Sequence, residues 1–297
     1  MLTVPFAVST DAAAILQLVP LAILAVLYAR RARSLAEGAQ RLARWRQTCF
    51  YGGLASVALA LGALARIGQE LLFMHTLGDL LIGEIAAALI VLGLTAPLLA
   101  PLLRIRAVDR LRVLAHPLPA FALWAVNLYV WHLPALYQAA LRHPGVQALQ
   151  HAMLLVFAIN MWMCLLGPLA SPRWFGDTAK LIYILAVGVA GAVLSNIMLW
   201  SGTAFYPYYL KGDAHFHISP VADQSIGGAI MLLTASIGTL CLFCWLFLRV
   251  TREQAPLDSS RARGLGLGEM RAGALARRRD PEPRERLEAR SGARERM

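Results

Sequence analysis

The sequence has few charged residues and lacks the motifs of the common enzyme classes. Only 15% of its 297 residues are Asp, Glu, Lys or Arg, which is too few to cover a soluble fold of this size. It contains no P-loop, no HExxH helix and no recognisable nucleophile with its base. We therefore expect that the protein is not an enzyme.

Cysteine and lysine are also scarce. The four cysteines lie within or beside apolar segments, which argues against the loop-borne disulfide framework of a secreted domain. Cys241 and Cys244 form a CxxC pair, but inside an apolar helix this pair is more typical of packing than of redox chemistry. The two lysines, Lys180 and Lys211, lie outside the last apolar segment, which excludes a retinal protein.

Apolar residues make up 58% of the chain, and the mean hydropathy is +0.58. Segments of about twenty apolar residues recur, the length that an α-helix needs to cross a bilayer. The fold class we expect is therefore an all-α polytopic membrane protein with seven transmembrane helices. The expected spans are residues 12–29, 49–67, 78–100, 118–138, 149–168, 179–200 and 226–247.

Arginine is distributed unevenly between the expected loops. Of the 28 basic residues, all but Arg66, Arg142 and Lys211 fall on one side of the expected membrane. The positive-inside rule then places the N-terminus outside and the C-terminus in the cytoplasm. This placement makes the net charge of +11 a topology signal, with the lipid bilayer rather than nucleic acid as the partner.

Two regions follow from this pattern. Residues 1–248 form the seven-helix transmembrane domain, and residues 249–297 form a basic tail. The tail has almost no apolar side chains to bury, so we expect it to be disordered or weakly helical. Its arginines reinforce the topology, and binding to anionic lipid headgroups is the alternative role.

Six of the seven histidines fall on or near the external face, and polar residues at membrane depth usually mark a functional site. His132 lies about six residues inside its expected span, or about 9 Å deep. Glu84 lies at a similar depth, and Asp79, His151 and Asp223 lie near the outer ends of three other spans. We expect these residues to surround one outward-facing pocket. The alternative is that His132 and His151 only hold helices together.

Three carboxylates differ in the role that their position in the sequence favours. Asp79 is four residues after His75, so the two share a helix face if the helix begins early enough, as ligands of one metal must. Glu84 is nine residues from His75, close to the opposite face of a regular helix, where a proton-handling or packing role fits better. Asp223 opens the last span and is either a ligand or the cap of its own helix.

The expected metal site therefore consists of His75, Asp79, His132, His151 and Asp223. Imidazole nitrogens with a carboxylate suit copper, zinc, iron or nickel, and thioether neighbours would favour Cu(I). Nearby methionines such as Met74, Met153 and Met198 are available, although methionine in an apolar helix mostly fills space.

Several short motifs together resemble one protein family. They are the HP at His116, the WHLPxxY from Trp131 to Tyr137, the LQH ending at His151, the YPYY from Tyr206 to Tyr209 and the DQxxGGxxM from Asp223 to Met231. In order and spacing they resemble the multi-span CtaG family of cytochrome c oxidase assembly proteins. The resemblance covers about residues 72 to 231.

The resemblance implies a membrane factor that helps to mature haem-copper oxidases, with oxidase subunits as partners and copper as a transiently bound ion delivered from the outer side. It also implies the plasma (inner) membrane of a bacterium. One residue departs from the family pattern. The family usually has two histidines four apart at the start of the third span, and here Asp79 stands in the second position after His75.

Two other functions remain open from the sequence. A membrane redox protein would bind haem between His132 and His151. A transporter or channel for copper or protons would use Glu84 and His132 as relay groups.

Overall fold

The fold consists of helices packed as a bundle. The computed structural model of the chain describes residues 10–37, 41–106, 114, 116–169 and 171–279, and these contain helices and no strands. The all-α prediction is confirmed for this part of the chain. The chain divides into two compact units, Met1–Phe243 and Cys244–Met297.

Seven long helical stretches make up most of the chain. Five are single helices and two are interrupted by a π-helical segment. The single helices are α1 (Thr10–Glu37), α8 (Pro117–Trp131), α10 (Pro144–Leu166), α11 (Asp177–Trp200) and α13 (Pro220–Arg279). The interrupted stretches are α2 (Arg44–Leu59) with η1 (Ala60–Leu64) and α3 (Ala65–Gly68), and α4 (Leu72–Leu80) with η2 (Leu81–Ala86) and α5 (Ala87–Gly93).

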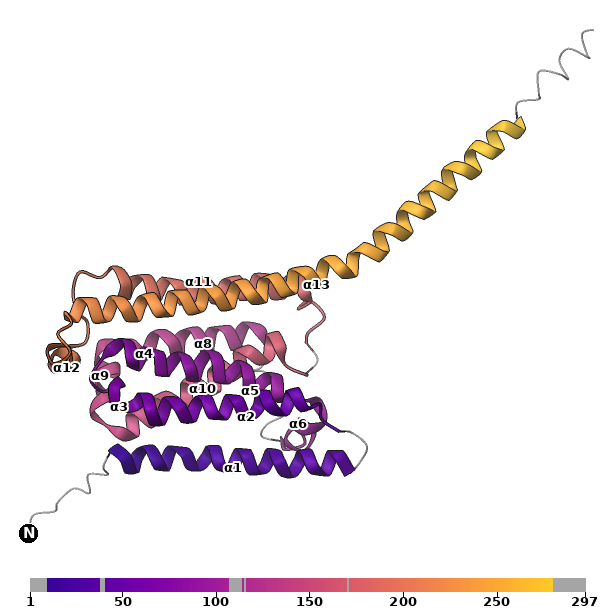
Figure 1. Cartoon of the computed structure of the whole chain (residues 1–297). Helices are drawn as coiled ribbons and strands as arrows, with labels where there is room; N and C mark the ends of the chain where they lie inside the picture. The colour runs from indigo at the N-terminus through magenta and orange to yellow at the C-terminus, as the bar shows by residue number, and fades with distance from the viewer. Residues whose placement is uncertain (1–9, 38–40, 107–113, 115, 170, 280–297) are drawn as a thin grey trace, which may run out of the picture. The chain divides into compact units, whose positions relative to one another are not determined.

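The remaining elements are short and connect the long helices: α6 (Ala96–Leu103), α9 (Pro134–Arg142), η4 (Pro207–Tyr209) and α12 (Leu210–His215). Figure 1 shows the long helices of the first unit running side by side. Within it α10 packs against α8 and α5, and α5 packs against α2.

Five of these stretches are long and apolar enough to cross a membrane: Arg44–Gly68, Leu72–Gly93, Pro144–Leu166, Asp177–Trp200 and Pro220–Arg249. Helix α8 is apolar but shorter. Many large apolar side chains of α11 and α13 are exposed, among them Ile182, Val189 and Leu233. Such surfaces suit contact with lipid rather than water.

The fourth expected span, residues 118–138, is not continuous. Helix α8 ends at Trp131 and α9 begins at Pro134. Pro134 has no backbone N–H to donate, and it pushes the preceding residue out of the helical region. Leu133 accordingly has φ −63° and ψ 130°. His132 therefore lies at the end of a helix rather than inside one.

The third expected span is shifted. It was expected over residues 78–100, but its helix begins at Leu72 and ends at Gly93, and α6 follows separately from Ala96. The early start brings His75 into the same helix as Asp79, which the metal hypothesis required.

The tail was expected to be disordered or weakly helical. Residues 249–279 continue α13 as a helix. Alanine, leucine and arginine are frequent there, and each has a high helix propensity. Residues 280–297 lie outside the described part of the chain.

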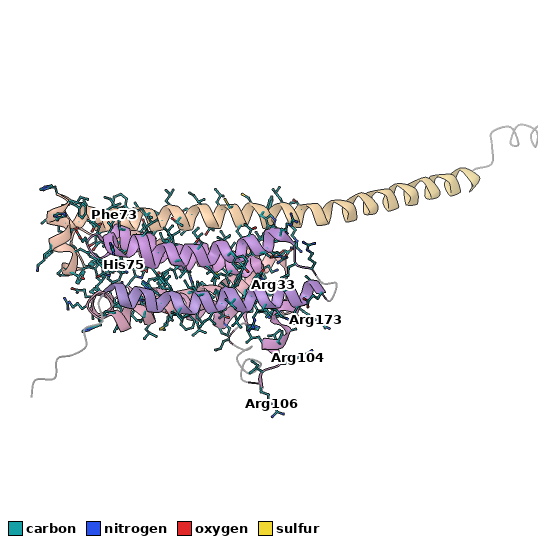
Figure 2. The ribbon with its side chains drawn as sticks, turned by 60° about the horizontal axis from the view of Figure 1, so that its bottom comes forward. Arg33, Phe73, His75, Arg104, Arg106 and Arg173 are labelled. Carbon is teal, nitrogen blue, oxygen red and sulfur yellow. The ribbon has the colours of Figure 1, made fainter. Side chains whose placement is uncertain are left out.

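Basic residues gather at one end of the bundle. Figure 2 labels Arg33, Arg104 and Arg173 at the end opposite to His75. The two ends therefore differ in chemistry, one carrying arginine and the other carrying His75.

Helices α11 and α13 approach each other through small residues. A Cβ atom added to Gly228 would lie 2.7 Å from the backbone nitrogen of Leu199 and 2.8 Å from the carbonyl oxygen of Ser195. Small residues let two backbones come this close where lipid surrounds the helices.

Gly228→Ala should destabilise the protein, because the new methyl group meets backbone atoms that cannot move aside. A loss of about 1–3 kcal/mol in the free energy of unfolding is expected from overpacking. Thermal unfolding in detergent measures it. Gly238→Ala on the same helix is the matched control, since nothing lies within 4 Å of its added Cβ, and equal stability of the two variants would contradict the packing argument.

Candidate metal centre

Three of the five expected ligands come together near one end of the bundle. His75 and Asp79 lie one turn apart on α4, and His151 lies on the neighbouring helix α10. One ligand atom from each can be chosen so that all three lie within 4.8 Å of one another. We call His75, Asp79 and His151 the ligand cluster.

The distances in the ligand cluster suit a shared ion better than direct hydrogen bonds. The Nε2 atom of His75 lies 3.6 Å from Oδ2 of Asp79, and Nε2 of His151 lies 3.8 Å from Oδ1. A hydrogen bond would need about 2.7–3.2 Å. Ligands about 2.1 Å from one tetrahedral ion stand about 3.4 Å apart, so a small inward movement would complete a three-ligand site.

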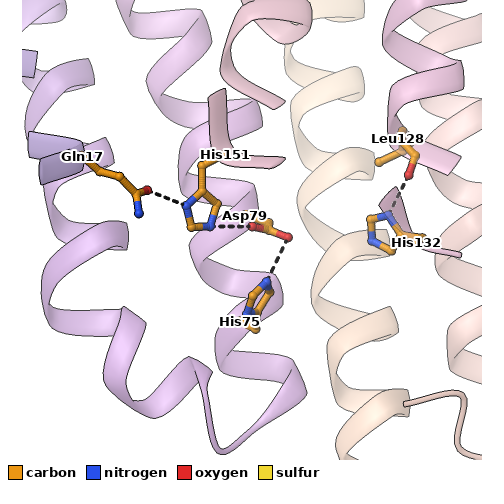
Figure 3. Close-up of polar contacts among 6 residues, drawn as sticks. All are labelled: Gln17, His75, Asp79, Leu128, His132 and His151. Atoms are coloured by element: carbon orange, nitrogen blue, oxygen red, sulfur yellow. Dashed lines mark hydrogen bonds and ion pairs between the residues drawn. The ribbon is translucent and has the colours of Figure 1, made fainter. Parts of the chain in front are cut away.

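The tautomer of His151 also suits metal binding. Its Nδ1 lies 3.1 Å from the side-chain oxygen of Gln17 on α1, and because that oxygen can only accept, Nδ1 carries the proton. In the neutral ring Nε2 then presents a lone pair toward Asp79, as Figure 3 shows. Metal-binding histidines are commonly held by a partner on the other nitrogen in this way.

His75 is the most enclosed of the three ligands. It is 7% exposed, and its Nε2 atom is buried without a hydrogen-bond partner in the described chain. The ring of Tyr137 lies 5.2 Å away, centroid to centroid. A buried acceptor facing a carboxylate is costly unless a proton or a cation lies between them.

His132 is not part of the ligand cluster. Its Nδ1 donates to the carbonyl oxygen of Leu128 at 2.8 Å, and Figure 3 places it apart from the other two histidines. The ligand cluster lines a small cavity of about 20 Å³, the first cavity. His132 lines a different one of about 50 Å³, the second cavity, and Asp79 reaches both.

Asp223 serves a different purpose from the one expected. Its carboxylate accepts hydrogen bonds from the backbone nitrogens of Leu72 at 2.7 Å and Phe73 at 2.9 Å. It therefore caps the N-terminus of α4 rather than that of its own helix α13. A carboxylate at this position satisfies free N–H groups and interacts favourably with the helix dipole.

The residues after Asp223 hold the same region together. Gln224 accepts from the backbone of Phe205 and donates to the carbonyls of Met198 and Thr203. Ser225 donates to the carbonyl of Leu199. The DQS segment therefore ties α13 to α4, to α11 and to the loop after α11.

The tyrosines of two sequence motifs meet beside the ligand cluster. Tyr137 stacks on Tyr206 with ring centroids 4.2 Å apart, and the Tyr206 hydroxyl donates to the His132 carbonyl at 2.8 Å. Neither ring was predicted to have a role, because contacts between residues so distant along the chain leave no local signal in the sequence. The motifs that carry the family resemblance meet here.

Glu84 faces the bundle interior, which a regular helix would not have allowed together with Asp79. It lies in the π-helix η2, whose i→i+5 bonding brings residues five apart closer to one face. Asp79 and Glu84 consequently both line the second cavity. Glu84 also lines a third cavity of about 60 Å³ between α8, α11 and α13. The sequence gives no sign of the π-helix.

The remaining candidates stay outside the ligand cluster. Cys241 and Cys244 are free and exposed, and the ring of His116 lies 5.4 Å from that of Trp174. His217 has a positive φ of 56° in the loop that follows α12. None of these is among the ligand groups found in the described chain.

A second carboxyl, Asp213 on α12, lies against Asp223. Asp213 is 2% exposed. Burial, reinforced by a hydrogen bond with Asp223 and by the charge of Asp223, raises the pKa of Asp213 from 3.8 to about 7. In its protonated form Asp213 donates to the Asp223 carboxylate, which also caps α4.

The sequence matches one described family over most of its length. The model of the cytochrome c oxidase caa3 assembly factor family (Caa3_CtaG) matches residues 26–253. The match includes the whole ligand cluster, Glu84 and Asp223, and it leaves out Gln17. No curated protein and no solved structure matches the chain.

Asp223→Ala should destabilise the protein by removing both caps of α4. Hydrogen bonds to a charged group contribute roughly 1.5–3 kcal/mol, so the free energy of unfolding should fall by about that amount. Thermal unfolding in detergent measures the loss. Asp223→Asn keeps an acceptor oxygen and should lose less, whereas a Asp223→Ala variant as stable as the parent would show that the cap is dispensable.

Asp213 should make stability depend on pH. Its pKa is higher in the folded protein than in the unfolded chain, so the folded state binds the extra proton. The stabilisation is complete below pH 3.8 and is lost as the pH rises to about 7. Unfolding temperatures measured across this window should fall for the parent. In Asp213→Asn that component should vanish, and an unchanged pH profile in the variant would refute the assignment.

Proposed function

This chain belongs to the family of cytochrome c oxidase caa3 assembly factors, and from that premise we propose that it binds a copper ion at the ligand cluster and helps its insertion into the oxidase. The observation that carries the proposal is the mutual approach of His75, Asp79 and His151. Copper here is a cargo and not a permanent cofactor, and the protein has no catalytic role.

Three protein ligands suit a carrier that must release its ion. Two imidazoles and a carboxylate leave a coordination position open, so an incoming ligand from the oxidase can begin to bind before a histidine leaves. Side chains of the ligand cluster are partly exposed, 12% for Asp79 and 15% for His151. Gln17 keeps His151 in the binding tautomer. The three ligands come from α4 and α10, and α10 packs against η2 and α5, which continue the α4 stretch.

The proposed topology has seven spans, formed by α1, α2 to α3, α4 to α5, α8, α10, α11 and α13. The arginines at the end opposite to His75 (Figure 2) support a cytoplasmic side there. The N-terminus and the ligand cluster then face outward, and α13 leads into a cytoplasmic tail from residue 249. The membrane is that of a bacterium, and the partners are oxidase subunits at its outer surface.

The haem alternative has less support. His132 and His151 line different cavities, and Asp79 lies at the border of both. An iron between two axial histidines needs both rings to face one space large enough for the macrocycle. Copper needs only the three ligands that already lie together.

Changes to the ligand cluster should abolish copper binding. The purified protein in detergent, titrated with Cu(I) against a competing chelator, should bind copper in an equimolar amount. His75→Ala and His151→Ala should lose it, whereas His132→Ala and His143→Ala should keep it. Loss in His132→Ala with retention in His151→Ala would contradict the assignment.

Two milder variants test the same site without removing a histidine. Gln17→Ala frees the His151 ring and should weaken binding by roughly 10–100-fold, the usual effect of losing a group that orients a ligand. Asp79→His restores the pair usual in the family and should bind Cu(I) more tightly, because imidazole is the softer ligand. Unchanged Cu(I) affinity in a folded Asp79→His would show that residue 79 does not contact the ion.

A further inference from the structure

Glu84 is an unusual residue to find in the middle of this bundle. It lies twelve residues after Leu72 and nine before Gly93 in one candidate span, about 18 Å and about 14 Å from its ends. No hydrogen bond or ion pair reaches it from the described residues. A carboxyl without a partner at this depth is expensive, and such residues usually mark the path of an ion or a proton.

Two cavities meet at Glu84. The second cavity extends from Asp79 and His132 to Glu84, and the third continues from Glu84 past Ser195 to Thr239. Their volumes are about 50 and 60 Å³, and a site needs only about 10–15 Å³ to hold one water. Each cavity therefore has room for several waters beside the carboxyl.

The second cavity also contains an unpaired polar atom. Asn127 on α8 is 5% exposed, and its side-chain oxygen is buried without a partner in the described chain. Asn127 lines the cavity together with Thr76 and Glu84. A buried acceptor needs a donor, and a water in this cavity would supply one. The unpaired oxygen of Asn127 therefore supports the presence of water in this cavity independently of Glu84.

We propose that the second cavity is a wet half-channel through which Glu84 exchanges a proton with water at the end of the bundle that carries the ligand cluster. A proton passes along the waters to a carboxylate oxygen of Glu84, leaving a neutral carboxylic acid, and it returns by the same route. The third cavity, inward of Glu84, stays outside this route.

The surroundings of Glu84 favour a proton over a metal ion. The titratable side chains in the walls of the two cavities are Glu84 itself, Asp79 and His132. The third cavity adds hydroxyl groups and aromatic rings, and the Ser195 hydroxyl already donates to the Gly191 carbonyl at 2.8 Å. Glu84 belongs to no group of side chains in the described chain that lie close enough to hold one ion, whereas a proton needs only the carboxyl and a chain of waters.

Infrared spectroscopy of the full-length protein in lipid, without added metal, tests the proposal directly. The carbonyl stretch of a protonated carboxylic acid should be present, should disappear as the pH is raised, and should shift promptly in D2O. Asp213 has a protonated carboxyl of its own in this pH range, so the comparison is made in an Asp213→Asn background. There Glu84→Gln should lose the band, and Glu70→Gln should keep it, because Glu70 is exposed at the end of the bundle. A band that survives in the Asp213→Asn, Glu84→Gln double variant would overturn the proposal.

Two glycines allow the route itself to be tested. Gly83 lines the second cavity and Gly238 the third, and neither has any atom within 4 Å of an added Cβ. Gly83→Leu should fill the half-channel and delay the D2O shift of the Glu84 band, whereas Gly238→Leu should leave it prompt. Equal exchange in Gly83→Leu and the parent, or a delay only in Gly238→Leu, would overturn the route. Because no metal is added, these results do not depend on whether the ligand cluster binds copper.

Discussion

The carboxylate of Asp223 fixes where α4 begins, and the site depends on that start. By accepting from the backbone nitrogens of Leu72 and Phe73, it lets the helix include His75, one turn before Asp79 on the same face. Without this cap, the first N–H groups of α4 would be buried and unpaired. The contact links residues about 150 positions apart, so the first turn of α4 forms only when α13 is in place. Assembly of the site is thereby tied to assembly of the bundle.

The polar groups inside the bundle are positioned by deviations from regular helix. Pro134 interrupts the fourth span, so that α8 ends at Trp131 and His132 lies at the end of a helix. A π-helical segment turns Glu84 toward the cavity that Asp79 also lines. The helix break and the π-helix each place a polar side chain against an internal space rather than against lipid. Charged or titratable groups can be solvated in such an internal space. Small residues of α11 and α13 line the third cavity, which also contains Glu84.

How far the sequence predicted this arrangement depends on the range of the interaction. Helix content, apolar segments and the His75–Asp79 pair follow from local periodicity. The partner of Asp223 could not be predicted, because a capping carboxylate carries no record of which helix it caps. Gln17 was missed for the same reason. The approach of Glu84 to the cavity that Asp79 lines could not be predicted either, since spacing arguments assume 3.6 residues per turn and a π-helix breaks that assumption. The grouping of His132 with His151 rested on expected depth, and the break at Pro134 removed that basis.

The central claim is that copper is held by His75, Asp79 and His151. X-ray absorption at the copper edge of the loaded, purified protein reads the ligand atoms directly. The account predicts a first shell of nitrogen and oxygen, with the multiple scattering of two imidazole rings and no sulfur. A shell dominated by sulfur would place the ion among methionines or cysteines instead and would contradict the account.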